Sequence, residues 1–129
     1  MDGALPQGFI VLLLLLQLKH AVADGPLQTL WMLREKGHYG RPGGLAHAAI
    51  HGAGALAALF VSGMAAPVAL ALAAADAILH YHIDFAKETL VRRFDWSNDK
   101  PMFWWALQAD QMLHQFSYVA ITVLASRWA

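Results

Sequence analysis

The feature that most constrains the fold is a series of long apolar segments separated by short polar joints. The segments span residues 9–33, 45–64, 66–90 and 102–125. Each has roughly the 20 residues that an α-helix needs to cross a hydrocarbon layer about 30 Å thick. Backbone groups in lipid must be hydrogen-bonded within the chain, which a helix achieves. The pattern predicts an all-α, polytopic membrane protein, a four-transmembrane-helix bundle in which residues 1–129 form a single integral membrane domain.

Composition favours lipid over water as the surroundings of these helices. Hydrophobic residues make up 58% of the chain and charged residues 14%, whereas a soluble domain has roughly a quarter charged. A soluble helical bundle is the alternative, but it needs a polar face on every helix, and residues 65–75 carry no polar side chain. Nine basic and nine acidic residues balance, which argues against nucleic acid as a partner. Without cysteine, disulfides and thiolate metal sites are excluded.

Prolines and a leader-like stretch bear on where the helices begin and end. Gly25-Pro26 lies inside the first segment and should kink the helix or end it early, because proline lacks an N–H. Residues 9–23 resemble a secretory leader, but the stretch before them contains Asp2 and no Lys or Arg, so we expect no cleavage. The remaining prolines near predicted helix starts, where a missing N–H costs little, are Pro42, Pro67 and Pro101.

Basic residues predict the orientation in the bilayer, because they concentrate on the cytoplasmic side. The joints after the first and third segments contain Arg34, Lys36, Arg41, Arg92, Arg93 and Lys100. The opposite side carries only Arg127. We therefore expect these two joints to be cytoplasmic and both termini to lie outside.

The polar residues inside the apolar segments occur in pairs four residues apart. The pairs are His20 and Asp24, His47 and His51, His80 and Asp84, and Asp110 and His114. This spacing puts both side chains on one face of a helix, one turn apart. Four helices that each contribute such a face surround a shared polar interior. Seven histidines in so apolar a chain are more than packing requires.

The order of the pairs indicates that they share the same depth. The first and third segments run from His to Asp toward the cytoplasm, and the fourth, which runs the other way, has Asp before His. The aspartates lie about nine residues from the cytoplasmic end, and His20, His80 and His114 about thirteen, which predicts two layers about 6 Å apart. His51 falls near the aspartate layer. His47 lies shallower, and a gate residue is the alternative to a ligand there.

These residue types point to a bound divalent metal. Imidazole and carboxylate suit zinc first, with iron or manganese as alternatives. The predicted ligands are His20, Asp24, His47, His51, His80, Asp84, Asp110 and His114. A divalent cation would offset aspartates that are costly in a bilayer. The alternative is a metal-free network of hydrogen bonds that holds the helices together.

Catalytic roles are predicted for Asp84, Asp110 and Lys87. A carboxylate that is not needed as a ligand can take a proton from a metal-activated water. Lys87 follows Asp84 by three residues, so it either stabilises a developing oxyanion or pairs with Asp84. Asp76 precedes His80 by four residues and is expected to orient its imidazole.

Short strings around the paired residues carry a family resemblance. They are His20-Ala-Val-Ala-Asp24 with Leu27-Gln28, His47 and His51, His80-Tyr-His-Ile-Asp84 with Lys87, and Asp110-Gln111-Met-Leu-His114. Nearly the whole chain resembles an uncharacterised bacterial family of small membrane proteins, domain-of-unknown-function family 3307. The resemblance implies four membrane helices and a role for these His and Asp positions, but no activity. In the inner membrane of a bacterium, the orientation predicted from the basic residues puts both termini in the periplasm. The chain departs from the family at Gly25-Pro26, where a bulky apolar residue is more usual. A looser similarity links it to bacterial membrane-bound metal-dependent hydrolases.

Several functions are compatible with such a site. The first is a metal-dependent hydrolase acting on a lipid-like or small amphiphilic substrate from the cytoplasmic half of the bilayer. The alternatives are a metal-ion or proton binding or transport protein, a di-iron oxidoreductase acting on lipid or quinone, and a b-type haem protein. The di-iron alternative lacks the Glu-x-x-His pairs of ferritin-like sites, and haem would leave the aspartates unexplained. Membrane lipid is the expected partner, and assembly into a homo-oligomer stays open.

Overall fold

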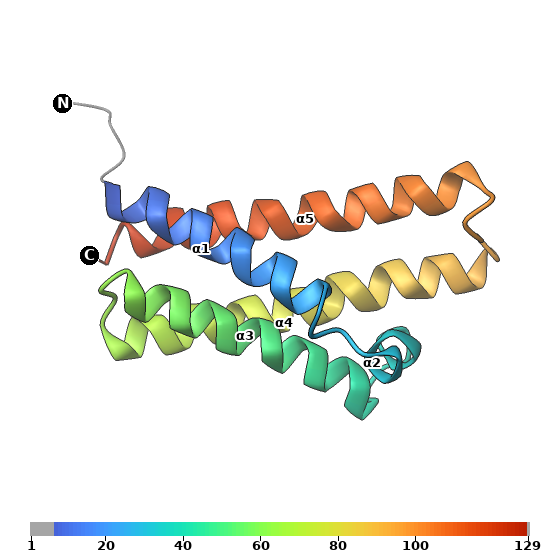
Figure 1. Cartoon of the computed structure of the whole chain (residues 1–129), viewed down its shortest axis with the longest axis horizontal. Coiled ribbons are helices and arrows are strands. Elements are labelled where there is room, and N and C mark those ends of the chain that lie inside the picture. Colours follow the sequence, from blue (N-terminus) through green and yellow to red (C-terminus); the bar gives the residue numbers. More distant parts are fainter. Residues whose placement is uncertain (1–6, 129) are drawn as a thin grey trace.

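The chain folds into helices alone in the part that the structure, a computed structural model, describes, residues 7–128 (Figure 1). The helices are α1 (Gln7–Asp24), α2 (Leu30–Glu35), α3 (Pro42–Val61), α4 (Ala66–Arg93) and α5 (Pro101–Ala125). No strand occurs among these residues, so the predicted all-α fold is confirmed. Residues 1–6 and 129 lie outside the described part, and so do the expectations for Asp2 and for the two termini.

The first predicted span forms two helices. α1 ends at Asp24, and a turn separates it from the short α2. Pro26 has no N–H to continue the helix, while Leu27 donates its N–H to the Val22 carbonyl oxygen at 3.1 Å and closes the last turn. The early end expected from Gly25-Pro26 is confirmed. Asp24 therefore becomes the last residue of α1, where the chain turns away.

Local chemistry determines where the other helices begin. Proline is the first residue of α3 and of α5 and the second of α4, where its missing N–H costs little. α2 begins after Thr29, whose hydroxyl oxygen accepts the Met32 N–H at 3.3 Å. At the start of α3, the Gly43 N–H donates to the Glu35 carboxylate at 2.6 Å, which ties α2 to α3.

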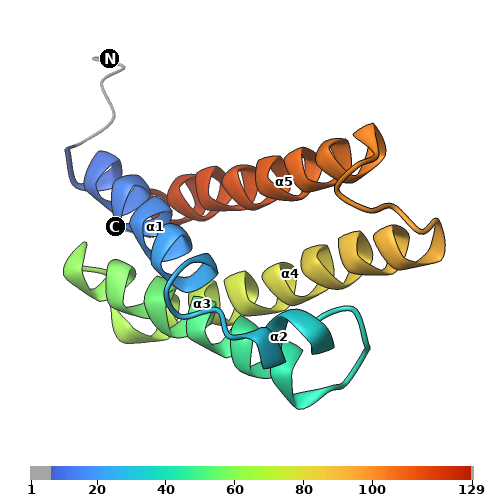
Figure 2. The ribbon, with the colours of Figure 1, turned by 45° about the vertical axis from the view of Figure 1, so that its right-hand side comes forward.

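The four long helices pack in a ring around a common interior, and α2 lies against α3 (Figures 1 and 2). α1 and α4 each contact both α3 and α5, so they stand opposite one another in the ring. Small residues allow a close approach: a Cβ added at Gly52 of α3 would lie 3.0 Å from the Ala77 Cβ of α4. A Cβ added at Gly54 would lie 3.0 Å from the Lys19 Cβ of α1.

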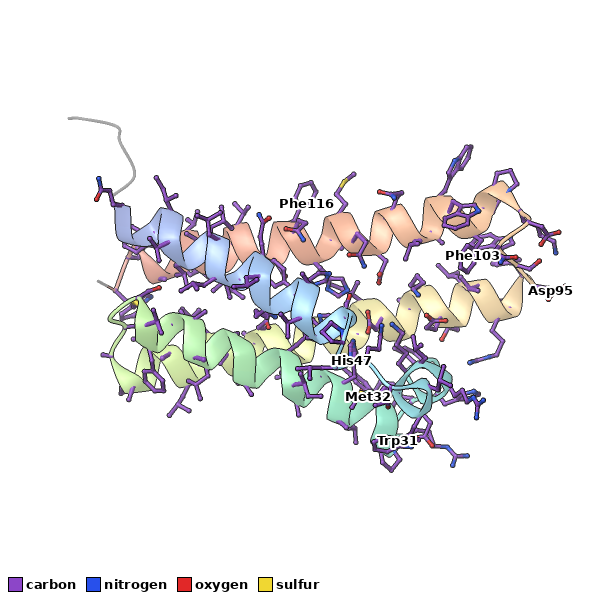
Figure 3. All side chains as sticks on the ribbon, in the orientation of Figure 1. Trp31, Met32, His47, Asp95, Phe103 and Phe116 are labelled. Carbon is purple, nitrogen blue, oxygen red and sulfur yellow. The ribbon has the colours of Figure 1, made fainter. Side chains whose placement is uncertain are left out.

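The interior has an apolar part and a polar part, while the outside is apolar. The apolar core gathers Leu12, Leu16, Leu59, Leu72, Tyr118 and Ile121, among others. The buried polar residues lie closer to the C-terminal end of α1, and they include His20, His47 and Asp84. Large apolar side chains cover the outer faces. Leu14 is 62% exposed, and Phe116, which is 61% exposed, stands on the outside of α5 in Figure 3. A polar interior inside an apolar surface suits a lipid environment.

Three helices in the described part are long and apolar enough to cross a membrane: α1, α3 and α4. α5, the fourth predicted span, has 25 residues but is not among the helices that meet this requirement. Its apolar character is diluted by Gln108, Asp110, Gln111, His114 and Gln115. Length and composition therefore bear out a membrane protein with three candidate spans rather than the predicted four.

Candidate metal centre

The paired residues all point into the polar part of the interior. α1, α3, α4 and α5 each supply one pair, and the one-turn spacing puts both members on the inner face of their helix. The pairs on α3, α4 and α5 are at most 4% exposed, and His20 is 6% exposed. The Asp24 side chain is 22% exposed. Figure 3 marks His47 beside the C-terminal end of α1.

Asp24 lies at the centre of a first group of ligand atoms. Its Oδ1 is 2.8 Å from His51 Nε2, 3.2 Å from His47 Nε2 and 4.0 Å from His80 Nε2. The Nε2 atoms of His47 and His80 lie 3.3 Å apart. These four residues offer ligand atoms that all lie within 4.8 Å of one another, an arrangement with room for a metal ion.

Asp84 lies at the centre of a second group. Its Oδ1 is 3.1 Å from His114 Nε2, and its Oδ2 is 3.4 Å from His80 Nε2 and 3.3 Å from His47 Nε2. His80, Asp84 and His114 form this group. Asp110 extends it, since its Oδ1 is 3.4 Å from His114 Nε2. The two groups share His80, and the two oxygens of Asp84 face one group each.

The spacings agree with those of ligands around one ion. Zinc binds imidazole nitrogen and carboxylate oxygen at about 2.0–2.2 Å in a tetrahedron, so two ligands of one ion lie about 3.3–3.6 Å apart. In the second group, Asp84 lies 3.4 Å from His80 and 3.1 Å from His114. The 3.3 Å between His47 and His80 has the same size. The side chains therefore need little rearrangement to accept a cation.

Several buried polar atoms of the centre lack a hydrogen-bond partner among the described residues. They are Oδ2 of Asp84, Oδ1 of Asp110 and Nδ1 of His47, His80 and His114. Buried polar atoms are almost always paired, and a carboxylate oxygen without a donor is costly in a low-dielectric interior. Both unpaired oxygens face imidazole Nε2 atoms, so a cation between them would bind carboxylate oxygen and Nε2 together.

The charge balance fits a divalent cation as well. The interior around the centre contains carboxylates on Asp24, Asp76, Asp84 and Asp110 and ammonium groups on Lys19 and Lys36. With neutral imidazoles, the carboxylates exceed the ammonium groups by two negative charges. Uncompensated charge is expensive away from water, and one divalent ion would cancel it.

Among the predicted ligands on helices α1, α3 and α4, His20 alone belongs to neither ligand group. Its Nε2 is 2.9 Å from Gln111 Oε1 and 3.1 Å from Asp24 Oδ2, and its Nδ1 is 2.6 Å from Tyr118 Oη. Gln111 in turn donates to Asp110 Oδ2 at 3.1 Å. Tyr118 was not among the predicted site residues. It follows His114 by four residues, so the helical spacing places both on the same face of α5.

Lys19 and Asp76 form a buried ion pair beside the centre. Lys19 Nζ donates to Asp76 Oδ2 at 2.6 Å and lies 3.2 Å from His51 Nδ1. The prediction that Asp76 orients His80 is wrong, because the His80 Nδ1 atom has no hydrogen-bond partner within residues 7–128. The carboxylate is drawn to the ammonium group of the facing helix α1 instead.

Two other lysines differ from expectation. Lys36, assigned only to a cytoplasmic joint, is 6% exposed, and its Nζ lies 3.5 Å from Asp84 Oδ2. No helical spacing reveals it, since it follows α2, outside the predicted pairs. Lys87 pairs with Glu88, so its predicted pairing with Asp84 is wrong.

The histidine rings stack on one another. His80 stacks on His51 at 3.4 Å and on His114 at 4.1 Å between ring centroids. His51 thus lies against the His80 imidazole and, with its Nε2 2.8 Å from Asp24 Oδ1, also beside an aspartate, which agrees with its predicted place near the aspartate layer. His47 is 1% exposed and lies 5.1 Å from His80 between centroids. The prediction that His47 lies shallower than the other paired residues is therefore wrong, since its Nε2 is 3.2 Å from Asp24 Oδ1 and 3.3 Å from Asp84 Oδ2.

A lateral groove between α4 and α5 reaches the centre. It has a volume of about 330 Å³ and an almost wholly apolar lining. The groove exists because the side chains at Ala86, Ala106 and Ala109 are small. The charged groups in its wall are Lys87 and Asp110. Asp110 therefore borders both the groove and the second ligand group.

Comparison with known proteins bears on the family and on nothing finer. No curated protein and no solved structure matches the chain, and the looser similarity to metal-dependent hydrolases is not shown. A family model described as protein of unknown function (DUF3307) matches residues 11–128, a range that includes every predicted ligand. The chain therefore belongs to the DUF3307 family.

Proposed function

We propose that this protein binds divalent metal inside the membrane and uses it to hydrolyse a lipid-like, amphiphilic substrate. The observation that carries the proposal is the pair of adjacent ligand groups that share His80, with Asp84 Oδ2 of the second group 3.3 Å from His47 Nε2 of the first. A metal ion at such a site suits displacement reactions at acyl or phosphoryl centres, because it activates a water molecule and polarises the scissile group. Nitrogen and carboxylate ligands favour zinc, with iron and manganese as alternatives.

The proposal includes α5 as a fourth span. The polar residues that lower its hydropathy include Asp110 and His114, which are 4% and 0% exposed because they face the bundle. Its outer face carries Leu113 and Phe116, which are 51% and 61% exposed. A helix that is apolar outside and polar inside is expected where polar residues line a site within a membrane. The proposal puts residues 34–44 and 92–100 on the cytoplasmic side of the bacterial inner membrane, because basic residues concentrate on that side.

The ligand residues and the proton acceptor have separate places. Asp24, His47, His80, Asp84 and His114 would hold the metal, which when bound activates a water molecule and polarises the scissile group. Asp84 faces both groups, which makes it a ligand. Asp110 Oδ1 has no hydrogen-bond partner in the part of the chain that the structure describes, and Asp110 also borders the groove. Asp110 is therefore the proton acceptor in this proposal.

The groove supports an amphiphilic substrate. Its apolar wall lies between α4 and α5 on the outer surface of the bundle, where acyl chains surround the protein in a bilayer. An apolar chain would lie along the groove, and its polar end would meet Asp110 and Lys87 at the wall. The Lys87 ammonium group would then face a developing oxyanion.

Metal content and turnover together test the proposal. The purified full-length protein should contain roughly one or two zinc, iron or manganese ions per chain and should hydrolyse chromogenic acyl or phosphoryl amphiphiles. Ala109→Trp should fill the groove and abolish turnover while metal content stays unchanged. Ala49→Trp is the matched control, because Ala49 lines a separate groove between α3 and α4. Absence of stoichiometric metal, or equal turnover in both variants, would refute the proposal.

A further inference from the structure

The interior histidines divide into two classes according to what faces their ring nitrogens. We infer that His20 and His51 are positioning residues whose protonated Nε2 atoms face Asp24 and bind no metal. The metal-binding class is His47, His80 and His114. The inference rests on the proposed function for the metal ligands, whereas the hydrogen-bond assignment stands on geometry alone.

Lys19 determines the proton position on His51. An ammonium group has donors and no acceptor, and Lys19 is ion-paired with Asp76 at 2.6 Å. It lies 3.2 Å from His51 Nδ1, so that nitrogen must accept. The proton of the neutral ring is then on Nε2, which donates to Asp24 Oδ1 at 2.8 Å. A protonated nitrogen has no lone pair for a metal, so His51 does not ligate through Nε2.

Gln111 determines the proton position on His20. A carboxylate only accepts, so the Gln111 amide nitrogen donates to Asp110 Oδ2 at 3.1 Å and its oxygen faces His20 Nε2 at 2.9 Å. That oxygen accepts, so His20 Nε2 carries the proton, and it also lies 3.1 Å from Asp24 Oδ2. The other nitrogen, Nδ1, accepts from the Tyr118 hydroxyl at 2.6 Å.

The two imidazoles therefore flank Asp24, one at each carboxylate oxygen: His51 donates to Oδ1, and the His20 Nε2–H group, which donates to Gln111, lies 3.1 Å from Oδ2. Asp24 needs such support because it is the last residue of α1, and the C-terminal end of a helix dipole repels a carboxylate. Fixed in this way, Asp24 keeps lone pairs for a metal on the side that faces His47. Partners that orient a ligand commonly change metal affinity about 10–100-fold.

The second class has no such constraint. Nδ1 of His47, His80 and His114 has no hydrogen-bond partner among the described residues. No neighbouring donor therefore prevents Nδ1 from carrying the proton of the neutral ring. Nε2 is then unprotonated, and its lone pair is free to bind a cation. With His51 excluded, the first group keeps Asp24, His47 and His80. Three protein ligands with an open position are typical of catalytic rather than structural zinc sites.

NMR of the metal-free, full-length protein labelled at histidine nitrogens tests the hydrogen-bond assignment. His20 and His51 should each show a protonated Nε2, with assignments from His20→Gln and His51→Gln. Lys19→Met keeps the stem but removes the donor, so the His51 signal should shift toward a mixture of tautomers while His20 stays unchanged. A wild-type His51 protonated on Nδ1, or a Lys19→Met protein with an unchanged His51 signal, overturns the assignment.

Cobalt absorption tests the ligand classes. Glutamine still provides an N–H donor, so His51→Gln should keep the wild-type ligand-field bands and cobalt stoichiometry, with affinity reduced at most about 100-fold. His80→Gln, the matched control, should change the bands and lose cobalt. Equal changes in the two variants would overturn the inference. A wild type that binds no cobalt would overturn the proposed function and the ligand class together, while NMR still decides the tautomers.

Discussion

Replacing Asp84 with asparagine separates a metal site from a hydrogen-bond network. Asp84 is 3% exposed, so the substitution acts in the interior of the bundle. Its oxygens lie within 3.5 Å of nitrogens on Lys36, His47, His80 and His114. Asparagine keeps the volume but removes the charge, and a neutral amide is a poor ligand for zinc.

The size of the effect follows from binding linkage. An ion present at about 100–1,000 times its Kd stabilises the folded state by about 2.7–4.1 kcal/mol. For a chain of 129 residues, 1 kcal/mol corresponds to about 3–4 °C in Tm. Loss of the ion should therefore lower Tm by roughly 8–16 °C, whether the cause is Asp84→Asn or a chelator.

A metal-free network predicts a different response to chelator. Hydrogen bonds in membrane proteins average about 0.6 kcal/mol each, so losing the contacts of one carboxylate with its neighbours would cost on the order of 2 kcal/mol. That cost overlaps the loss expected from metal, so the variant alone does not decide. Chelator decides, because it changes nothing in a network without metal.

The assay is thermal unfolding in detergent, with and without chelator, of the wild type and Asp84→Asn. The wild type should lose stability in chelator, and Asp84→Asn, already depleted of metal, should respond much less. Asp95→Asn is the control, because the Asp95 side chain is fully exposed, and it should behave like the wild type. A wild type whose Tm ignores chelator and that carries no stoichiometric metal would refute the metal centre.

Two further predictions concern particular contacts, and a third concerns the orientation in the membrane. Lys36→Met removes an ammonium group 3.5 Å from Asp84, so zinc should bind about tenfold tighter in competition with a chelator; weaker binding would contradict a purely electrostatic role. Gly52→Leu places a side chain where a Cβ would already lie 3.0 Å from Ala77 Cβ, so thermal unfolding should show a loss of about 1–3 kcal/mol, and an unchanged Tm would argue against this helix contact. In topology, a cysteine at position 97 should react only with cytoplasmic reagent and a cysteine at position 62 only with external reagent; the reverse pattern would invert the orientation.

The sequence alone was sufficient for the properties that depend on neighbours along the chain. Apolar length predicted the helices, and proline predicted the start of α3 and the early end of α1, since both effects act within one helical turn. The i, i+4 spacing placed His80 with Asp84 and Asp110 with His114 on shared faces, because the rise and twist of a helix are the same in every protein. These local rules therefore predicted that the paired His and Asp residues face the interior of the bundle.

Only the tertiary structure decided which side chains from different helices meet. Asp76 pairs with Lys19 of α1 rather than orienting His80, and Lys36 comes to lie 3.5 Å from Asp84 after the turn at Gly25-Pro26 redirects the chain. Each contact depends on how far the helices are rotated and shifted against one another, which side-chain packing determines and periodicity does not record. The partners of each imidazole nitrogen depend on the same packing, and so does the division of the histidines into ligands and positioning residues.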